Sequence, residues 1–391
     1  MKQLPKRLKL KLQLREASNA LRKLPVSKDL IDFASNDYLG LSQSEIIFNE
    51  THEYLLQNNI KVNGAKGSRL ISGNHNLYPI TEDFIANFHQ SQSALIFNSG
   101  YDANLGFFSS VPQRSDVILY DELCHASIRD GITMSNAKSY KFQHNNPDDL
   151  ERIILKLITQ NPIPKTQNLE PRIIYVVTES VFSMDGDCPN LEELVRLSEK
   201  YHCNLVVDEA HALGVFGDFG HGLVQSFNLQ DKVFARIITF GKALGCHGAA
   251  ILGSVELKSY LVNFARSFIY TTGLSPNSVA TILVAYQHLE SEKLAMQNLK
   301  RNIQFFNQEE MQLGLKPLFV YSKSAIQCAI IPGNEKVKSI ANKLQEKGFD
   351  VKAILSPTVP EGQERLRFCL HSYNSEEEIS NVLQLLSTFV F

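Results

Sequence analysis

The chain has 391 residues, of which 43% are hydrophobic and 20% are charged. These values are ordinary for a globular protein and exclude a wholly disordered chain. The 39 basic and 41 acidic residues give a formal net charge of −2, so nucleic acid is disfavoured as the main partner. At roughly 150 residues per domain, the length predicts two or three domains, or one large domain with an appendage.

The cysteines and the apolar runs of the sequence indicate the cellular location of the protein. The six cysteines are far apart and form no Cys-x-x-Cys pair, which favours reduced thiols and a cytoplasmic location. No uninterrupted apolar run reaches the roughly 18 residues of a membrane helix, so we expect no membrane span. The basic, acid-poor N-terminus is also compatible with a transit peptide.

Residues 1–45 are predicted to form an N-terminal arm. One face of a helix in this arm would consist of Leu10, Leu14, Ala17, Leu21 and Leu24. The leucines at every second position from residue 8 to residue 14 are also typical of a strand. The helix is the preferred of these two interpretations.

Residues 46–280 are predicted to form a large α/β domain. Within residues 80–255, short runs rich in Val and Ile alternate with helix-like stretches, which is typical of a mostly parallel sheet covered on both faces. The expected strands span residues 94–98, 116–120, 172–177, 204–210, 236–240 and 249–253. Asn190, three residues before Glu193, predicts the start of a capped helix. The apolar stripe of this helix would consist of Leu191, Leu194, Val195 and Leu197.

Residues 281–391 are predicted to form a smaller α+β domain. It is expected to follow one long amphipathic helix marked by Leu289, Met296, Leu299, Ile303 and Phe306. Strands are expected at residues 325–333 and 365–370, with a helix between them that ends at Gly348. The sequence shows no internal repeat and no low-complexity tract.

The most informative segment is NLVVDEAHALG, in which an apolar strand ends at Asp208 and His211 follows in the turn. Ligands of open α/β sheets bind at such strand ends. The tetrapeptide DEAH also occurs in helicase motors, which need a phosphate-binding P-loop as well. The only Gly-Lys pair, Gly241-Lys242, lacks both the first glycine and the final Ser or Thr of that loop. A helicase is therefore disfavoured.

Lys242 lies just past the strand expected at residues 236–240, one βαβ step after Asp208. Such a pair suits pyridoxal phosphate (PLP), because the lysine forms a Schiff base and the carboxylate keeps the pyridine nitrogen protonated. A solvated loop lysine and a helix-capping aspartate would give the same spacing. The pair is therefore informative only together with further candidates.

PLP also needs a phosphate cradle and a group that stacks on its ring. Ser99, Gly100 and Tyr101 open an expected helix whose free backbone amides suit a phosphate dianion, although a plain tight turn would have the same residues. His125, beyond the strand at residues 116–120, is a candidate to stack on the ring. The alternative for His125 is a capping or surface histidine.

Further polar side chains follow the remaining strands. Glu179 and Ser183 come after the strand at residues 172–177, where they can bond the polar rim of the cofactor. Arg365 and Arg367 share one face of the C-terminal strand, where one of them can hold a substrate carboxylate, or neither has a function. No zinc motif, Gly-x-Ser-x-Gly elbow or Gly-x-Gly-x-x-Gly loop competes, so no metal site is predicted.

Eight motifs, in one order along the chain, resemble the α-oxoamine synthases, a family of PLP-dependent enzymes of fold type I. They are NDYLGLS, GSRLISG, NSGYDAN, DELCHASI, TESVFSMDGD, VVDEAH, TFGKALG and FIYTTGLSP. The resemblance extends from about Arg15 to the C-terminus. It implies a mostly parallel sheet in a large cofactor-binding domain and a smaller α+β C-terminal domain. It also implies an acyltransferase that joins an amino acid to an acyl thioester and releases carbon dioxide.

The resemblance implies a role for each matching residue around the cofactor ring. Lys242 would hold the cofactor and later move the Cα proton of the substrate. Asp208 would pair with the pyridinium nitrogen, and His125 would stack on the ring. Ser183 and His211 would bond the phenolic oxygen of the ring.

Other matching residues would lie at the edge of the ring and around the phosphate. Glu179 would be a supporting polar group near the ring. The phosphate would be bound by Gly100, Tyr101 and Thr239. Thr271 or Thr272 would reach the phosphate from the second subunit of an obligate homodimer, which predicts a shared active site.

The resemblance also implies how the substrates are held. Asn36 and Arg367 would orient the amino-acid carboxylate, and Arg22 would meet the acyl donor, which keeps the arm in the mature protein. The segments SAIQCAIIPGN and PTVPEGQERLRF are most similar to the family member that uses L-alanine and a pimeloyl thioester on CoA or a carrier protein.

Other functions share these motifs. Glycine with acetyl-CoA would use the same cofactor residues, although the C-terminal segments and Arg22 favour pimeloyl. A non-catalytic partner subunit is disfavoured, since it would be expected to lose Lys242. A PLP-dependent aminotransferase would transfer the amino group without releasing carbon dioxide.

One position departs from the pattern of the family. A histidine usually stands five residues after the glycine that corresponds to Gly73, and this chain has Tyr78 there. His75 lies nearby but out of register. The exchange removes any role borrowed for that histidine and leaves the cofactor residues unchanged.

Overall fold

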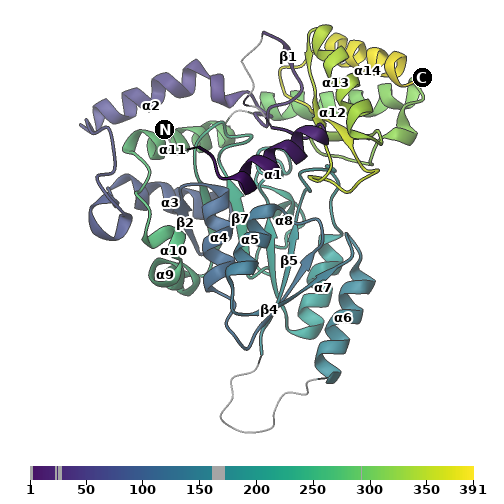
Figure 1. Cartoon of the computed structure of the whole chain (residues 1–391). Coiled ribbons are helices and arrows are strands. Elements are labelled where there is room, and N and C mark those ends of the chain that lie inside the picture. Colours follow the sequence, from purple (N-terminus) through teal and green to yellow (C-terminus); the bar gives the residue numbers. More distant parts are fainter. Residues whose placement is uncertain (1–2, 23, 25–28, 161–171, 292) are drawn as a thin grey trace. The chain divides into compact units, whose positions relative to one another are not determined.

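Figure 1 shows the computed structural model of the chain, which describes residues 3–22, 24, 29–160, 172–291 and 293–391. The chain divides into two units, each built from separate segments. The large unit comprises Asp37–Ser183 and Cys188–Met296. The small unit comprises Met1–Asn36, Met184–Asp187 and Gln297–Phe391.

A seven-stranded sheet in the order β2-β8-β7-β6-β5-β3-β4 organises the large unit. Its strands are β2 (Ser93–Phe97), β3 (Val117–Asp121), β4 (Lys138–Phe142), β5 (Ile174–Glu179), β6 (Asn204–Asp208), β7 (Ala235–Thr239) and β8 (Ala249–Gly253). Strand β8 is antiparallel to both of its neighbours, and the other pairs are parallel. The predicted mostly parallel sheet is confirmed, and all six expected strands are present with small shifts at their ends.

Strand β4 is absent from the strands expected from the sequence. It lies at the edge of the sheet, where β3 is its one partner among the described strands. Its sequence is KSYKF, and four of its five residues are exposed while Phe142 is buried. An edge strand with one buried side chain gives no apolar run, which explains why the sequence pattern missed it.

Helices cover the sheet of the large unit. They are α2 (Glu45–Gln57), α3 (Leu77–Phe88), α4 (Gly100–Ser110), α5 (Ala126–Met134), α6 (Pro147–Gln160), α7 (Leu191–Tyr201), α8 (Leu223–Ser226), α9 (Val255–Phe264), α10 (Arg266–Ile269) and α11 (Pro276–Ser291), with the short turns η1 (Leu41–Gln43) and η2 (Arg69–Gly73). Helices α4 and α5 lie side by side (Figure 1). With α9 and α10 they enclose a hydrophobic core that includes Phe107, Phe108, Val177, Val206, Ile237 and Leu261.

Helix α7 forms as its sequence predicts. The Asn190 side chain accepts a hydrogen bond from the backbone N–H of Glu193 at 3.1 Å, which satisfies one free amide of the first turn. The predicted stripe of Leu191, Leu194, Val195 and Leu197 is buried. The helix connects β5 to β6 and therefore helps to fix the strand that ends at Asp208.

The small unit is an α+β structure, as predicted. Its strands are β1 (Ile31–Asp32), β9 (Ile326–Ile330), β10 (Phe349–Asp350), β11 (Lys352–Ile354) and β12 (Arg365–Cys369). Strands β11, β12 and β9 form an antiparallel sheet in that order, and β1 pairs with β10 in parallel. The helices are α1 (Lys6–Ala17), α12 (Leu294–Gln312, of which the part from Gln297 on belongs to this unit), α13 (Asn334–Glu346) and α14 (Glu376–Val390), with the short 3-10 helix η3 (Lys316–Leu318).

The single long helix expected from Leu289 to Phe306 is wrong, because two helices occupy this stretch. Helix α11 ends at Ser291 and α12 begins at Leu294. Leu289 and Met296 are about two helical turns apart, so their apolar spacing cannot reveal an interruption. Helix α11 packs on α2 and α3, which places the end of the large unit beyond the expected boundary at residue 280.

The N-terminal arm contains a helix, and the strand interpretation is wrong. Helix α1 ends at Ala17, so Leu21 and Leu24 lie outside it. None of the residues of α1 is buried. Residues 37–45, which were expected to belong to the arm, are part of the large unit.

Membrane insertion of a helix finds no support in the described segments. None of their helices is both long enough and apolar enough to cross a bilayer. Nor do the described His, Cys, Asp and Glu side chains form a group of three or more that could hold a metal ion.

The core on the α4 side of the sheet should carry much of the stability of the large unit. We expect Phe107→Ala to lower the free energy of unfolding by about 3–5 kcal/mol, since the ring is fully buried and its loss leaves a cavity. Phe48→Ala is the control, because that ring is 63% exposed, and we expect a change within about 0.5 kcal/mol. Urea denaturation monitored by circular dichroism measures both, and equal losses would contradict the assignment of the core.

Candidate active site

A cavity of about 190 Å³ lies in the large unit, where β5, β6 and β7 end and α4 and α5 begin. Its lining includes the predicted site residues Gly100, Tyr101, His125, Glu179, Asp208, Thr239 and Lys242. Asn104, Ser127, Ala210, Ile237 and Ile238 complete it. Parallel strands bring their carboxyl ends to one edge of a sheet, which explains why residues so far apart in sequence meet here.

Asp208 and Glu179 are direct neighbours at the ends of β6 and β5. The two residues are paired in the strand register, and both side chains are buried. Asp208 accepts hydrogen bonds from Asn104 Nδ2 at 2.8 Å and from the backbone N–H of Ala210 at 2.9 Å. These two donors stabilise a buried carboxylate that points into the cavity.

Glu179 has an unusual acidity. Burial, and after it the negative charge of Asp208, raises the pKa of Glu179 to about 8, although Lys242 and a hydrogen bond act in the opposite direction. The hydrogen bond comes from the backbone N–H of His125, which donates to Glu179 Oε1 at 2.5 Å. At neutral pH Glu179 is therefore mostly protonated.

His125 begins helix α5 and is held in one tautomer. Its Nδ1 accepts from the backbone N–H of Ser127 at 3.2 Å and lies 2.7 Å from Ser127 Oγ. Desolvation in the cavity lowers the pKa of His125, while Asp208 acts to raise it. A neutral ring with Nδ1 as an acceptor carries its proton on Nε2, which suits stacking rather than ion pairing.

Lys242 lies in a tight turn after β7. The backbone N–H of Gly245 donates to the carbonyl of Lys242 at 2.8 Å, and Gly245 has φ +62°. A Cβ atom on Gly245 would lie 2.1 Å from the backbone nitrogen of Ser42. Only glycine fits this turn, which explains the glycine of the TFGKALG segment.

The start of α4 has the features of an anion cradle. Ser99 caps the helix by accepting from the backbone N–H of Asp102, which leaves the amides of Gly100 and Tyr101 at the open first turn. A Cβ atom on Gly100 would stand 3.6 Å from Oγ1 of Thr239, so β7 and α4 meet at this point. The Tyr101 side chain is directed to Asp130, to which its hydroxyl donates at 2.6 Å.

The other residues of the large unit that are expected to bind the cofactor do not line this cavity. His211 is buried, and its Nδ1 lies 2.7 Å from the hydroxyl of Tyr38. Ser183 follows β5 at the end of a segment of the large unit. Thr271 Oγ1 accepts from Asn98 Nδ2 at 3.0 Å, and the carbonyl of Thr272 accepts from the same group at 2.7 Å.

The small unit contains the residues expected to bind the substrates. Arg367 Nη2 donates to Asn36 Oδ1 at 3.0 Å, so these two predicted residues are brought together. Arg22 Nη2 donates to Thr358 Oγ1 at 3.3 Å. Arg365, the alternative to Arg367, pairs with Asp185 and donates to the carbonyl of Met184, which accounts for its charge structurally.

The sequence profile described as "Aminotransferase class I and II" matches residues 28–386 of this chain. The 8-amino-7-oxononanoate synthase of Emericella nidulans is 38% identical over 396 aligned residues, which cover 97% of this chain and 94% of the relative. The chain belongs to the class I and II aminotransferase family. It is a PLP-dependent enzyme of the α-oxoamine synthase group, as the eight motifs predict.

Solved structures of this family share the fold. The structure of 8-amino-7-oxononanoate synthase from Francisella tularensis has a TM-score of 0.74 and 29% identity, covering 93% of this chain and 98% of that one. A serine palmitoyltransferase from Sphingomonas wittichii has a TM-score of 0.87 and 25% identity, covering 99% and 98%. The predicted fold type I is therefore confirmed.

The cavity has the donor set that the PLP of this family requires. A protonated pyridine nitrogen needs an acceptor, and Asp208 offers a buried carboxylate held by two donors. A phosphate dianion needs free amides, which the first turn of α4 offers at Gly100 and Tyr101. An aldehyde needs an amine, and Lys242 lines the same cavity. The residues present therefore fit the cofactor.

Three residues of this site were missed by the sequence reasoning. Asn104 and Ser127 line the cavity and are hydrogen bonded to each other at 3.0 Å, and they orient Asp208 and His125. Tyr38 contacts His211. Asn104 ends the motif NSGYDAN and Tyr38 stands in NDYLGLS, so the motifs contained the signal, but contacts between distant helices and strands show what these side chains do.

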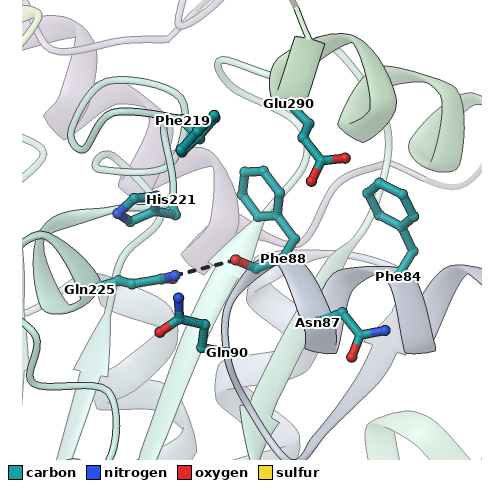
Figure 2. Close-up of a pocket in the computed structure, with 8 residues that line it drawn as sticks. All are labelled: Phe84, Asn87, Phe88, Gln90, Phe219, His221, Gln225 and Glu290. Atoms are coloured by element: carbon teal, nitrogen blue, oxygen red, sulfur yellow. Dashed lines mark hydrogen bonds between the residues drawn. The ribbon is translucent and has the colours of Figure 1, made fainter.

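A second and larger cavity lies elsewhere in the large unit (Figure 2). It measures about 440 Å³ and is lined by Phe84, Asn87, Phe88, Gln90, Phe219, His221, Gln225 and Glu290. Gln225 Nε2 donates to the carbonyl of Phe88, as Figure 2 shows. None of the predicted site residues is in this lining.

The raised pKa of Glu179 predicts how pH affects stability. This carboxyl binds its proton more tightly in the folded state, where its pKa is about 8, than at the ordinary value of 4.5. Its contribution to stability is therefore complete below pH 4.5 and is lost as pH rises through 8. In the cofactor-free protein, we expect Glu179→Gln to reduce the loss of stability between about pH 5 and about pH 9.

Urea denaturation at the two pH values measures this difference. Glu199→Gln, at a carboxylate that is 54% exposed, is the control and should keep the wild-type difference. An unchanged pH dependence in Glu179→Gln would show that another group causes the loss.

Proposed function

We propose that this chain condenses L-alanine with a pimeloyl thioester, releasing carbon dioxide and the thiol to give 8-amino-7-oxononanoate for biotin biosynthesis. The observation that carries the proposal is the convergence of Lys242, Asp208 and His125 in one cavity. Support for the substrates comes from 38% identity to an 8-amino-7-oxononanoate synthase over nearly the whole of both chains. The acyl group arrives on CoA or on a carrier protein.

PLP, when bound, supplies an electron sink for the charge that develops at Cα of alanine and again on decarboxylation. Lys242 takes the Cα proton from alanine and later returns a proton to the product. Asp208 pairs with the protonated pyridine nitrogen, and Asn104 and the amide of Ala210 hold its side chain in place for this. Asp208, Asn104 and Ala210 together orient the hydrogen bond to the pyridine nitrogen, on which the electron sink depends.

The groups around the ring set its orientation. His125 presents a neutral ring for stacking, with its tautomer fixed by Ser127. Glu179 is a supporting polar group at the edge of the ring, and in the cofactor-free chain burial raises its pKa to about 8. Ser183 and His211 bond the phenolic oxygen in this proposal, and Tyr38 fixes the orientation of His211.

The phosphate is held at the start of α4. In this proposal the backbone amides of Gly100 and Tyr101 donate to it, and Thr239 adds a hydroxyl. Thr271 or Thr272 reaches the phosphate from the second subunit of a homodimer, so that the active site is shared. The motif FIYTTGLSP supports this part of the proposal.

The small unit binds the substrates in this proposal. Asn36 and Arg367 orient the alanine carboxylate, and their contact at 3.0 Å supports a common role. Arg22 meets the acyl donor. The six cysteines are far apart in the sequence and form no Cys-x-x-Cys pair, which supports the cytoplasmic location that we propose for the enzyme.

We expect product formation to depend on Lys242. Purified wild-type protein with PLP, L-alanine and pimeloyl-CoA should yield 8-amino-7-oxononanoate by mass spectrometry, and Lys242→Ala should yield none, because the cofactor anchor and the proton carrier are lost together. Lys232→Ala is the control, since Lys232 lies in an exposed ion pair with Glu199 at 3.2 Å.

Parallel reactions test the choice of substrates. A pimeloyl carrier protein replaces pimeloyl-CoA in one, and glycine with acetyl-CoA replaces both substrates in another. Amino-oxobutyrate from the glycine reaction, with no product from alanine and either pimeloyl donor, would refute the proposed substrates while leaving the PLP chemistry in place.

A further inference from the structure

The segment Thr271–Leu274 is fixed by hydrogen bonds that none of the proposed roles explains. It is the segment proposed to present threonine hydroxyls to the cofactor phosphate, so the present inference rests on the proposed function. Two side chains, Tyr78 and Asn98, bind this segment from opposite ends. All of these residues belong to the large unit.

Tyr78 holds the C-terminal end of the segment. Its hydroxyl accepts from the backbone N–H of Leu274 at 2.6 Å and lies 3.4 Å from the carbonyl of the same residue, to which it donates. The side chain is fully buried, and desolvation raises the pKa of Tyr78, so the hydroxyl keeps the proton that it donates. The nearby His75 Nε2 lies 3.2 Å from the same carbonyl of Leu274.

The Tyr78 ring is itself held in place. The Arg69 guanidinium lies 3.7 Å from the ring centroid, and it pairs with Glu82 at 2.6 Å. The same two charged groups bind the backbone of Ile96: Glu82 accepts from its N–H at 2.9 Å, and Arg69 donates to its carbonyl at 3.1 Å. The tyrosine is therefore anchored to strand β2, two residues before Asn98.

Asn98 holds the N-terminal end of the segment. Its Nδ2 donates to Thr271 Oγ1 at 3.0 Å and to the carbonyl of Thr272 at 2.7 Å. Asn98 directly precedes Ser99 and Gly100, where the phosphate cradle begins. The threonine segment and the phosphate cradle of the same chain are thus both connected to the C-terminal end of strand β2.

The space around Gly273 shows how closely the segment fits Tyr78. A Cβ atom on Gly273 would lie 3.0 Å from the Tyr78 hydroxyl and 3.3 Å from Arg69 Cγ. The backbone N–H of Gly273 donates to the carbonyl of Gly67 at 3.0 Å. The segment therefore packs closely against the tyrosine, and a side chain at residue 273 would disturb this contact.

We propose that Tyr78 and Asn98 are positioning residues that fix Thr271 and Thr272 for the cofactor phosphate. Tyr78 takes this part where the family usually has a histidine, and its longer side chain brings a hydroxyl to the backbone of Leu274. Neither residue touches the cofactor in this proposal. They act through the threonines and the cradle, so their loss affects recognition of the phosphate and not of the pyridoxal ring.

The test compares two ligands that differ only in the phosphate. Dissociation constants of PLP and pyridoxal are measured on the cofactor-free full chain through the absorbance of the Schiff base. For Tyr78→Phe, which keeps the ring and loses the hydroxyl, we expect the constant for PLP to rise about 5- to 10-fold. The constant for pyridoxal should stay within about twofold.

Tyr286→Phe is the matched control. Its hydroxyl is also fully buried, but it lies 3.0 Å from His89 Nε2 and not at Thr271–Leu274, so both constants should stay at the wild-type values. Asn98→Ala removes the second anchor and should weaken PLP selectively, which keeps the test available if Tyr78→Phe does not fold.

The outcomes separate this inference from the proposed function. A selective loss of PLP affinity in the Tyr78 or Asn98 variant supports the positioning role. Equal losses for PLP and pyridoxal, or no loss for either, overturn it while the wild type still binds PLP. Failure of the wild type to bind PLP in preference to pyridoxal would overturn the proposed phosphate site, and this inference with it.

Discussion

Two carboxyl groups buried side by side impose the strongest physical constraint on this structure. Glu179 and Asp208 are register partners at the ends of β5 and β6, and two negative charges at this separation in a buried site would repel each other strongly. The two carboxyl groups avoid this repulsion in different ways. Glu179 holds its proton, with a pKa of about 8, while Asp208 is stabilised by Asn104 and the amide of Ala210.

The difference between these two carboxyl groups determines which ligand the cavity can bind. One fixed carboxylate faces the cavity that Lys242 also lines, and the neutral His125 ring stands beside it. A protonated pyridine is the kind of cation that completes such an arrangement, because it brings a positive charge to a carboxylate already removed from water. The mostly parallel sheet is what makes the arrangement possible, since it brings the ends of β5, β6 and β7 to one edge.

Much of this could be predicted from the sequence, for physical reasons. Buried parallel strands need continuous apolar runs, so the strands ending near Glu179, Asp208 and Thr239 were found almost at their true bounds. The motifs identify the functional residues at the ends of these strands. Strand β4 could not be found in this way, because its exposed edge position needs no apolar run, and the break between α11 and α12 left the helical spacing of apolar residues intact.

Contacts between segments that are distant in the sequence are harder to predict than helices and strands. Asn104 stands on α4 and orients Asp208 at the end of β6, and Tyr38 bonds His211 across 173 residues of sequence. Tyr78 stands where the resemblance leads us to expect a histidine, and sequence alone gives it no role. The structure shows that its hydroxyl binds Leu274, which is a contact that depends on the three-dimensional packing of α3 against a remote segment.

The central claim is that PLP binds in the small cavity through Lys242. The direct measurement is reduction of the PLP-loaded protein with borohydride, followed by peptide mass spectrometry that locates the reduced pyridoxyl group. The account predicts one modified residue, Lys242, in the peptide that contains TFGKALG. A pyridoxyl group on a different lysine, or spread over several lysines, would contradict it.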